Sequence, residues 1–478
     1  MINFLKNNKH LFYIILLGLV LRVIFTLLVA RSFFGRDNIY IDGDTQAWGG
    51  CIENLLNSGT YTINPTHEYG YFGRMPGYSF FMGFFYIITG FNWELAYPII
   101  GWFQIIMDVW AIYLIYKIGI LIFKKNQIAL VISFLYACYP FIIVWNPVVY
   151  SESISTFFLL SGLLYFIDKE KKYYLIKSGI LFSIGSLIRP QLMILVIILC
   201  IYLLFDNRKN IKNILIKSCQ FGLTILIIYG SWPMRNYFLH DKIILTQDLR
   251  GITNWDIDAL SFMQYIYSVK AEWEPQFSQI IHNQKVTFPK EAYISEEDSL
   301  KLEEAVSLSK TCGSGFSNWR GYWSKRITGE NCNDRIAQLY DELRDNQIKN
   351  NPINFYIYVP LQNLKKALFK TEITNKSLSV RIPSLILFLY RTILIFAGLI
   401  AFMFIIKNNN YDKGILFIIL LFFIFLYLLL CAGTLPQTRN IEMRYFLPSD
   451  VLMIIPAGLL FYELGIYFKK HFSKSKIL

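Results

Sequence analysis

The chain has 478 residues, of which 55% are hydrophobic and 17% aromatic, and its mean hydropathy is +0.41. These values exceed those of soluble globular proteins, and apolar runs of membrane-spanning length recur, so a soluble protein is excluded. The net charge of +13 comes from basic residues clustered in short loops between the apolar runs. The positive-inside rule accounts for that distribution, so we expect no nucleic-acid partner.

The first apolar run, residues 11–30, follows a basic start that contains Lys6 and Lys9. It is long and lacks a small-residue cleavage site, so we expect a retained membrane span rather than a signal peptide. With the N-terminus in the cytoplasm, this span crosses outward and places the following loop outside.

Two carboxylates, Asp42 and Asp44, lie near the start of the polar stretch of residues 39–78. Apolar residues recur at helical spacing over residues 48–56, so the carboxylates head a short amphipathic helix, where either is a suitable N-cap. The stretch ends at Arg74, where a following proline and glycine turn the chain into the next apolar run.

The later apolar runs predict an all-α polytopic protein of the inner (plasma) membrane. The run of residues 78–90 is short for a crossing, so we expect a juxtamembrane or re-entrant helix there. Residues 95–123 then cross inward to a lysine pair. The other expected spans are residues 128–145, 147–167, 174–188, 192–205, 214–232, 382–406, 415–431 and 447–468. This gives about ten crossings, with an upper bound of about 13 transmembrane helices and both termini cytoplasmic.

The spans divide the chain into three parts. Residues 1–234 form an N-terminal transmembrane region that includes the first outside loop, residues 31–78. Residues 235–381 form an extracytoplasmic soluble domain, and residues 382–478 form a C-terminal transmembrane region.

The extracytoplasmic domain is predicted to be mixed but mainly helical. Residues 295–309 and 334–349 are acidic amphipathic stretches, and residues 353–369 read as an amphipathic helix lying on the bilayer. Cys312 and Cys332 both fall in this domain, and in an oxidising compartment they predict a disulfide.

Two charged residues lie deep within expected spans, where an unpaired charge costs several kcal/mol. Arg22 is near the middle of the first span and Asp108 near the middle of the second. We therefore expect these two side chains to pair and to serve a structural role.

The topology gathers a set of polar groups at the outer surface. Carboxylates there can act as general bases toward a hydroxyl, and arginines can hold a phosphate through bidentate hydrogen bonds. Each residue alone also has a plainer explanation, because arginines at span ends often snorkel and carboxylates often cap helices. The gathered residues are Asp42, Asp44, Arg74, Glu152, Arg189, Arg235 and Arg444.

Short motifs in this order resemble the outer-surface motifs of the polytopic GT-C glycosyltransferases, which include the protein O-mannosyltransferases and the lipid A aminoarabinose transferases. One departure is Met75, where the family tends to have proline. The motifs are DTQAW from Asp44, RMPGY from Arg74, PVVYSE ending at Glu152, LIRP around Arg189, SWPMRNY around Arg235 and RYFLP from Arg444. Together they span nearly the whole chain.

The resemblance implies an inverting transfer of a sugar from a polyprenyl-phosphate donor to an extracytoplasmic acceptor hydroxyl of a protein, lipid or envelope polymer. It assigns the general base to Asp44, with Asp42 as support or rival, and an orienting role to Glu152. Polyprenyl phosphate leaves, and its charge falls to Arg189, Arg235 and Arg444, with Arg74 less certain. Membrane lipids are expected to surround the spans.

A metal site is not predicted, although Asp42, Asp44, His67 and Glu68 offer ligands within one loop. No tight ligand spacing is present, so we expect no obligatory cofactor, with a divalent metal remaining an option. Two other functions stay open. An undecaprenyl-diphosphate glycan ligase or polymerase would also gather outward arginines, and a lipid flippase or transporter would place polar groups through the membrane depth.

Overall fold

The computed structural model describes residues 8–206, 211–252, 255–321, 331–369, 377–407, 413–432 and 442–474. Within these residues the regular secondary structure is entirely helical. This agrees with the all-α membrane fold that the sequence predicts.

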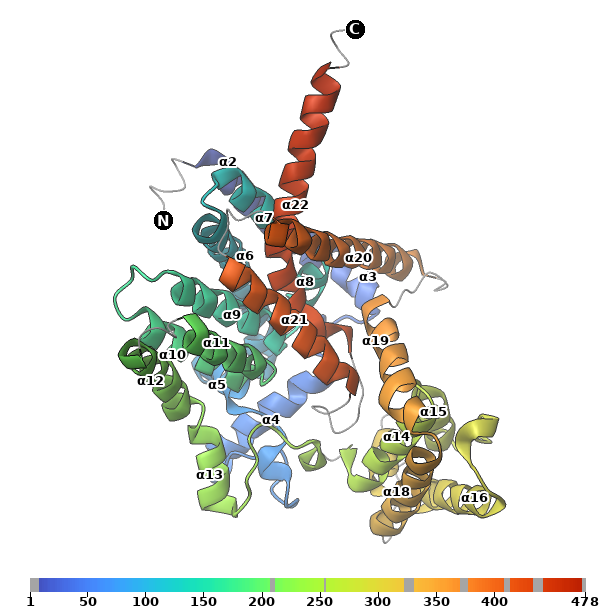
Figure 1. Cartoon of the computed structure of the whole chain (residues 1–478). Helices are drawn as coiled ribbons and strands as arrows, with labels where there is room; N and C mark the ends of the chain where they lie inside the picture. Colours follow the sequence, from blue (N-terminus) through green and yellow to red (C-terminus); the bar gives the residue numbers. More distant parts are fainter. Residues whose placement is uncertain are drawn as a thin grey trace.

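The first half of the chain builds most of the apolar body. Its helices are α2 (Lys9–Ile24), the π-helical turn η1 (Phe25–Val29), α3 (Ala30–Phe34), α4 (Gly43–Ser58), η2 (Gly70–Phe72), α5 (Pro76–Ile88), α6 (Trp93–Phe123), α7 (Asn126–Ala137), α8 (Pro140–Trp145), α9 (Ser151–Ile167), α10 (Tyr174–Ile188), α11 (Leu192–Asp206), α12 (Ile211–Ile228) and α13 (Ser231–His240). The last part of the chain adds α20 (Leu378–Lys407), α21 (Lys413–Ala432), η7 (Met443–Phe446) and α22 (Leu447–Lys474). In Figure 1, α22 and α2 reach the top of the molecule, whereas α4 and α13 lie toward the bottom.

Five helical stretches of the described chain are long and apolar enough to cross a membrane, and shorter apolar helices accompany them. The long stretches are Lys9–Phe34, Trp93–Phe123, Ile211–His240, Val380–Lys407 and Met443–His471. The expected span 128–145 is divided, because Pro140 cannot continue α7 and instead starts α8 at its first position. The number of crossings and the side on which each end lies remain predictions.

The core of this membrane body joins the two ends of the chain. One apolar cluster contains residues of α6, α7, α9 and α10 together with residues of α20, α21 and α22. Helix α22 packs against α7 and α20, so the last helix lies among the first ones (Figure 1). Packing of this kind brings side chains distant in sequence to one place.

Two buried ion pairs tie helices together inside this core. Arg22 of α2 hydrogen-bonds Asp108 of α6, and both side chains are fully buried, as the sequence predicts. Arg391 of α20 pairs with Asp450 of α22, which also accepts hydrogen bonds from two tyrosine hydroxyl groups. Each pair cancels charges that an apolar interior would not tolerate alone.

The helices of the predicted extracytoplasmic domain have a second, separate apolar core. They are η3 (Leu249–Gly251), α14 (Ile257–Val269), α15 (Glu274–Ile281), η5 (Lys290–Ala292), α16 (Glu296–Thr311), α17 (Ser314–Arg320), α18 (Asn333–Asn350), η6 (Asn354–Tyr358) and α19 (Val359–Phe369). The two acidic stretches predicted as helices are α16 and α18. In Figure 1, helices α14, α15, α16 and α18 lie at the lower right, away from the top of α22.

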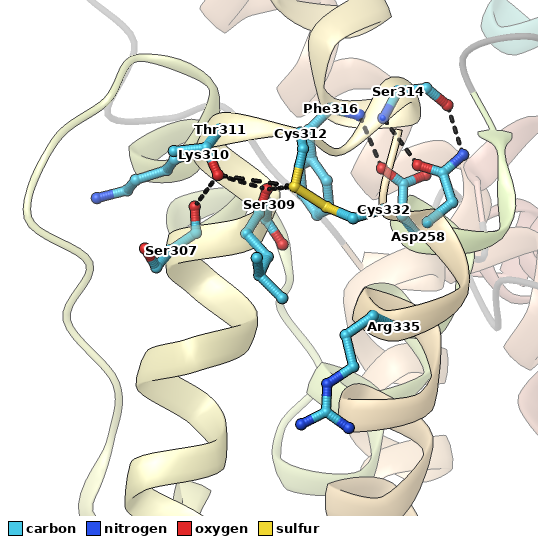
Figure 2. Close-up of a disulfide and its surroundings, with 12 residues drawn as sticks. Asp258, Ser307, Ser309, Lys310, Thr311, Cys312, Ser314, Phe316, Cys332 and Arg335 are labelled. Carbon is cyan, nitrogen blue, oxygen red and sulfur yellow. Dashed lines mark hydrogen bonds between the residues drawn. A yellow bond between two sulfur atoms is a disulfide. The ribbon is translucent and has the colours of Figure 1, made fainter. Parts of the chain in front are cut away.

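Cys312 and Cys332 form the expected disulfide, which joins the end of α16 to the start of α18 (Figure 2). Close to it, the buried carboxylate of Asp258 accepts hydrogen bonds from the backbone N–H groups of Gly315 and Phe316. These contacts fix the first turn of α17 against α14.

Replacing Arg391 with leucine should destabilise the protein strongly, because Asp450 would remain charged and unpaired in the core. Loss of one partner of a buried pair costs about 3–5 kcal/mol. The measurement is the thermal unfolding midpoint of the purified protein in detergent. The exposed Arg381 of the same helix supplies the control variant R381L. A double variant, R391L/D450L, should recover much of the loss, and an unchanged midpoint in R391L would contradict the structural role.

Candidate active site

The start of α4 separates the roles of the two carboxylates of the first outside loop. Asp42 is the N-cap: its side chain accepts a hydrogen bond from the N–H of Gly43, and with Thr45 it forms a capping box. Its carboxylate also pairs with Arg36 at 3.0 Å. Asp44 lies in the first turn of the helix and makes none of these bonds. Asp42 is therefore the capping residue, and the carboxylate of Asp44 takes no part in capping the helix.

Asp44 is held between two arginines from opposite ends of the chain. Its Oδ1 lies 2.5 Å from Nη2 of Arg74, and its Oδ2 lies 2.6 Å from Nη2 of Arg444. The Asp44 side chain retains 29% exposure, so it can still be reached. Burial acts to raise the pKa of Asp44, but the two guanidinium groups outweigh it and hold that pKa well below its usual range. Asp44 is thus fully ionised, and both of its oxygens are engaged.

Aromatic rings and a further carboxylate orient the two guanidinium groups. Arg74 stacks 5.0 Å over the ring of Trp48, and Arg444 lies 4.6 Å over the ring of Tyr150. The Nε of Arg444 also donates to Glu442 at 2.6 Å. Glu442 was not among the residues that the sequence singled out. Its only sequence signal is its place two residues before Arg444.

Arg189 and Glu152 form a buried brace behind Arg444. The Nη1 of Arg189 lies 2.7 Å from Oε1 of Glu152, and the Nη2 of Arg189 donates to the backbone carbonyl of Arg444 at 3.2 Å. The same Glu152 oxygen lies 3.8 Å from Nε of Arg444. Both braced side chains are 6% exposed or less. They are therefore placed to position Arg444 rather than to contact a substrate.

Close backbone packing brings these elements together. A Cβ at Gly77, in the first turn of α5, would lie 2.7 Å from the backbone at the end of α10, so only glycine fits there. The loop before α9 is anchored as well, because Gln104 donates to the carbonyl groups of Asn146 and Val148 at 3.0 and 2.8 Å. Thr45 of α4 donates to the carbonyl of Val149 at 3.1 Å. These contacts fix Asp44, Arg74 and Arg189 relative to one another.

Arg235, expected to join the phosphate-binding arginines, is placed elsewhere. Its guanidinium donates to the backbone carbonyl groups of Tyr61 and Tyr71 at 2.8 and 2.9 Å. It also lies over the ring of Trp232 at 5.2 Å. It therefore braces the far part of the first outside loop, because backbone carbonyls and an aromatic ring satisfy its donors and its charge.

A cavity of about 1670 Å³ opens beside Asp44. Its polar end is lined by Asp42, Asp44, Arg74, Tyr150, Glu442 and Arg444. Its other walls include apolar side chains of α11, α12 and α21, among them Met193, Ile197, Ile201, Ile225, Leu226 and Leu430. Glu152, Arg189 and Arg235 are not among the described residues that line it. The cavity combines a charged end, in which arginines and carboxylates are paired, with an apolar trough lined by α11, α12 and α21.

The potential metal ligands of the first outside loop do not converge. The Nε2 of His67 lies 3.9 Å from Oδ1 of Asp256, and the Oε1 of Glu68 lies 2.5 Å from Nζ of Lys242. Asp42 and Asp44 instead pair with arginines. In the part of the chain that the structure describes, no group of three His, Cys, Asp or Glu side chains has a metal-binding arrangement. The donor set around Asp44 therefore suits an anion better than a cation.

The chain was compared with protein-family models, with curated protein sequences and with solved structures. Residues 74–232 match the model of the dolichyl-phosphate-mannose-protein mannosyltransferase family, a segment that holds Arg74, Glu152 and Arg189. No curated protein sequence matches the chain at a significant level. Several of the solved structures that match are of an archaeal oligosaccharyltransferase.

That protein is the oligosaccharyltransferase AglB of Archaeoglobus fulgidus. Its complex with an inhibitory peptide and a dolichol-phosphate aligns with a TM-score of 0.54 at 14% identity, covering 98% of this chain and 52% of that one. A form tethered to an acceptor peptide aligns with 0.54 at 13% identity, covering 97% and 51%, and a form with Zn and sulfate aligns with 0.51 at 13% identity, covering 95% and 50%. This chain thus spans about half the length of the oligosaccharyltransferase. The alignment over nearly all of this chain shows that it has the GT-C fold of membrane glycosyltransferases.

Proposed function

We propose that the protein is an inverting glycosyltransferase that moves a sugar from a polyprenyl-phosphate donor to an acceptor hydroxyl outside the cytoplasm. The observation that carries the proposal is the cavity with Arg74 and Arg444 at one end and an apolar trough of α11, α12 and α21 at the other. A lipid phosphate has the same two parts, because its head is a compact anion and its tail is a long hydrocarbon. Arginine fits the head through paired, charge-assisted hydrogen bonds.

The two arginines carry the charge of the leaving group in this proposal. Arg74 pairs with Asp44, and Arg444 pairs with both Asp44 and Glu442. A phosphate entering the polar end competes with Asp44 for the same guanidinium groups. Redirecting them to the phosphate removes the charges that depress the pKa of Asp44, so donor binding makes this carboxylate more basic. The base is thereby activated when the donor is present.

The transfer is a single displacement at the anomeric carbon. Asp44 accepts the proton of the acceptor hydroxyl, and the hydroxyl oxygen forms the new bond to that carbon. The bond between the anomeric carbon and the phosphate oxygen breaks, and its electron pair leaves with polyprenyl phosphate. Arg74 and Arg444 stabilise the charge that develops on the phosphate, while Glu442 and the Glu152–Arg189 brace orient Arg444.

Asp44→Asn should lower kcat by about 10²–10⁴-fold while leaving the donor site in place, because the amide cannot accept the proton. Asp42→Asn is the matched control, since asparagine is also a good N-cap and should keep most activity. The measurement is transfer of radiolabelled sugar from a panel of undecaprenyl-phosphate sugars to membrane acceptors. Full activity in D44N would remove the base assignment, and loss in D42N alone would exchange the two roles. A glycan ligase would instead use diphosphate-linked donors in the same assay.

Arg444→Gln and Arg74→Gln should each weaken binding of undecaprenyl phosphate by about 10–100-fold, the worth of a charge-assisted hydrogen bond. Arg235→Gln should change that affinity by less than about twofold, since Arg235 bonds backbone carbonyls away from the cavity. Displacement of a labelled lipid phosphate from the purified protein measures all three. Equal losses of affinity in the three variants would contradict a phosphate site made of Arg74 and Arg444 alone. They would instead support Arg235 as a phosphate-binding residue, as the motifs predict.

We also propose that turnover requires no divalent metal, because two fixed arginine charges already face the position of the phosphate. Activity should therefore survive treatment with EDTA within about twofold. Loss of all turnover, regained on adding back one ion, would show that a metal is required.

A further inference from the structure

Two tryptophans of the extracytoplasmic part form a wall of the same cavity. Trp255, just before α14, and Trp319, in α17, both line it. Their rings meet edge to face with centroids 5.1 Å apart. Both side chains are half-buried, so part of each indole is open to the cavity. Neither residue has a role in the transfer step described above.

Trp319 is fixed in place by contacts at both ends of α17. At the start of the helix, Asp258 accepts bonds from the Gly315 and Phe316 N–H groups, and the Cys312–Cys332 disulfide lies alongside (Figure 2). At its end, Arg320 donates to the carbonyl groups of Ile281 and Lys310 at 3.0 and 3.1 Å. Because both ends of this short helix are anchored, Trp319 is held in one position, as residues of preorganised binding sites are.

Trp255 is tied to the loop that carries Arg74. The Asp248 N–H donates to the carbonyl of Phe72 at 2.9 Å, two residues before Arg74. A Cβ at Gly251 would lie 2.1 Å from the carbonyl oxygen of Tyr69, so the two backbones touch. The aromatic wall is therefore attached to the same loop that supplies one of the proposed phosphate-binding groups.

Polar side chains line the cavity along with the aromatic wall. Thr246 and Gln247 line it from a segment that is pinned in place, because Tyr229 and Trp232 donate to the carbonyl groups of Leu245 and Thr246 at 2.9 and 2.5 Å. Gln191 also lines the cavity, and its buried Oε1 has no hydrogen-bond partner. A buried acceptor without a partner is costly unless a ligand supplies a donor.

We propose that Trp255 and Trp319 form a carbohydrate-binding subsite of this cavity, with Gln191 and Gln247 as hydrogen-bonding groups for sugar hydroxyls. A pyranose ring has an apolar C–H face and a rim of hydroxyl groups, which matches a cavity lined by both indole rings and polar side chains. A lipid tail would need only the apolar trough, so it would not use the amide groups. The ring can belong to the donor or to a saccharide acceptor. The inference rests on the proposed function, because that function brings a sugar into the cavity.

The test compares binding of sugar-bearing and sugar-free probes by the full-length protein. The variants are W255A, W319A and the conservative W319F, with Y293A as the control, since Tyr293 is an exposed aromatic residue of the same domain that does not line the cavity. The first probe is undecaprenyl phosphate, the second is undecaprenyl-phosphate-mannose, and the third is a panel of soluble oligosaccharides offered to protein already loaded with undecaprenyl phosphate.

All four variants should bind undecaprenyl phosphate like the wild type. W255A and W319A should bind a sugar-bearing probe about three- to tenfold more weakly, and W319F should recover most of that loss. A loss confined to the mannose-bearing lipid assigns the subsite to the donor, and a loss confined to the oligosaccharides assigns it to the acceptor. Unchanged binding of every sugar-bearing probe would overturn the subsite, as would an equal loss for the sugar-free lipid. Failure of the wild type to bind undecaprenyl phosphate would refute the proposed function instead.

Discussion

The contact on which the site depends is the pair of ion bridges from Asp44 to Arg74 and Arg444. It joins the first outside loop to the turn before the last helix, positions 400 residues apart in the sequence. Arg74 and Arg444 face Asp44, and Arg444 is also paired with Glu442, so two acidic and two basic side chains balance one another at the polar end of the cavity. An anion that enters can therefore replace Asp44 without leaving either arginine unpaired. In the proposed mechanism, this exchange frees Asp44 to act as the general base.

Two further ion pairs, buried in the core of the membrane helices, support that contact. The Arg22–Asp108 and Arg391–Asp450 pairs lie within the helical core. Asp450 is in α22, only six residues after Arg444, which is in the preceding turn η7. Because a buried pair is costly to break, it fixes the position of α22 against α20. Arg391 also donates to the carbonyl of Met443, the residue just before Arg444. The geometry of the outer site is thus set partly by charges buried in the core.

The cavity has three regions that differ in chemistry. The charged end belongs to the loops after the first and before the last long helix, the apolar trough belongs to α11, α12 and α21, and the aromatic wall consists of Trp255 and Trp319. A lipid-linked sugar has a matching sequence of tail, phosphate and ring. In the proposed function, the part of the chain with its own core and disulfide contributes to sugar recognition, whereas Arg74 and Arg444 hold the phosphate.

The sequence by itself determined the helical membrane class, since apolar runs of spanning length can satisfy their backbone only as helices. It also predicted the pairing of Arg22 with Asp108 and of Cys312 with Cys332, because the members of each pair lie in the same expected compartment. The motifs selected Asp44, Arg74, Glu152, Arg189 and Arg444, which the structure gathers in one cluster. Tertiary structure alone decided which of them reach the cavity. Side-chain direction depends on packing between distant segments, so only the fold showed Arg235 turned toward carbonyls, Glu442 beside Arg444 and Trp319 at the cavity wall.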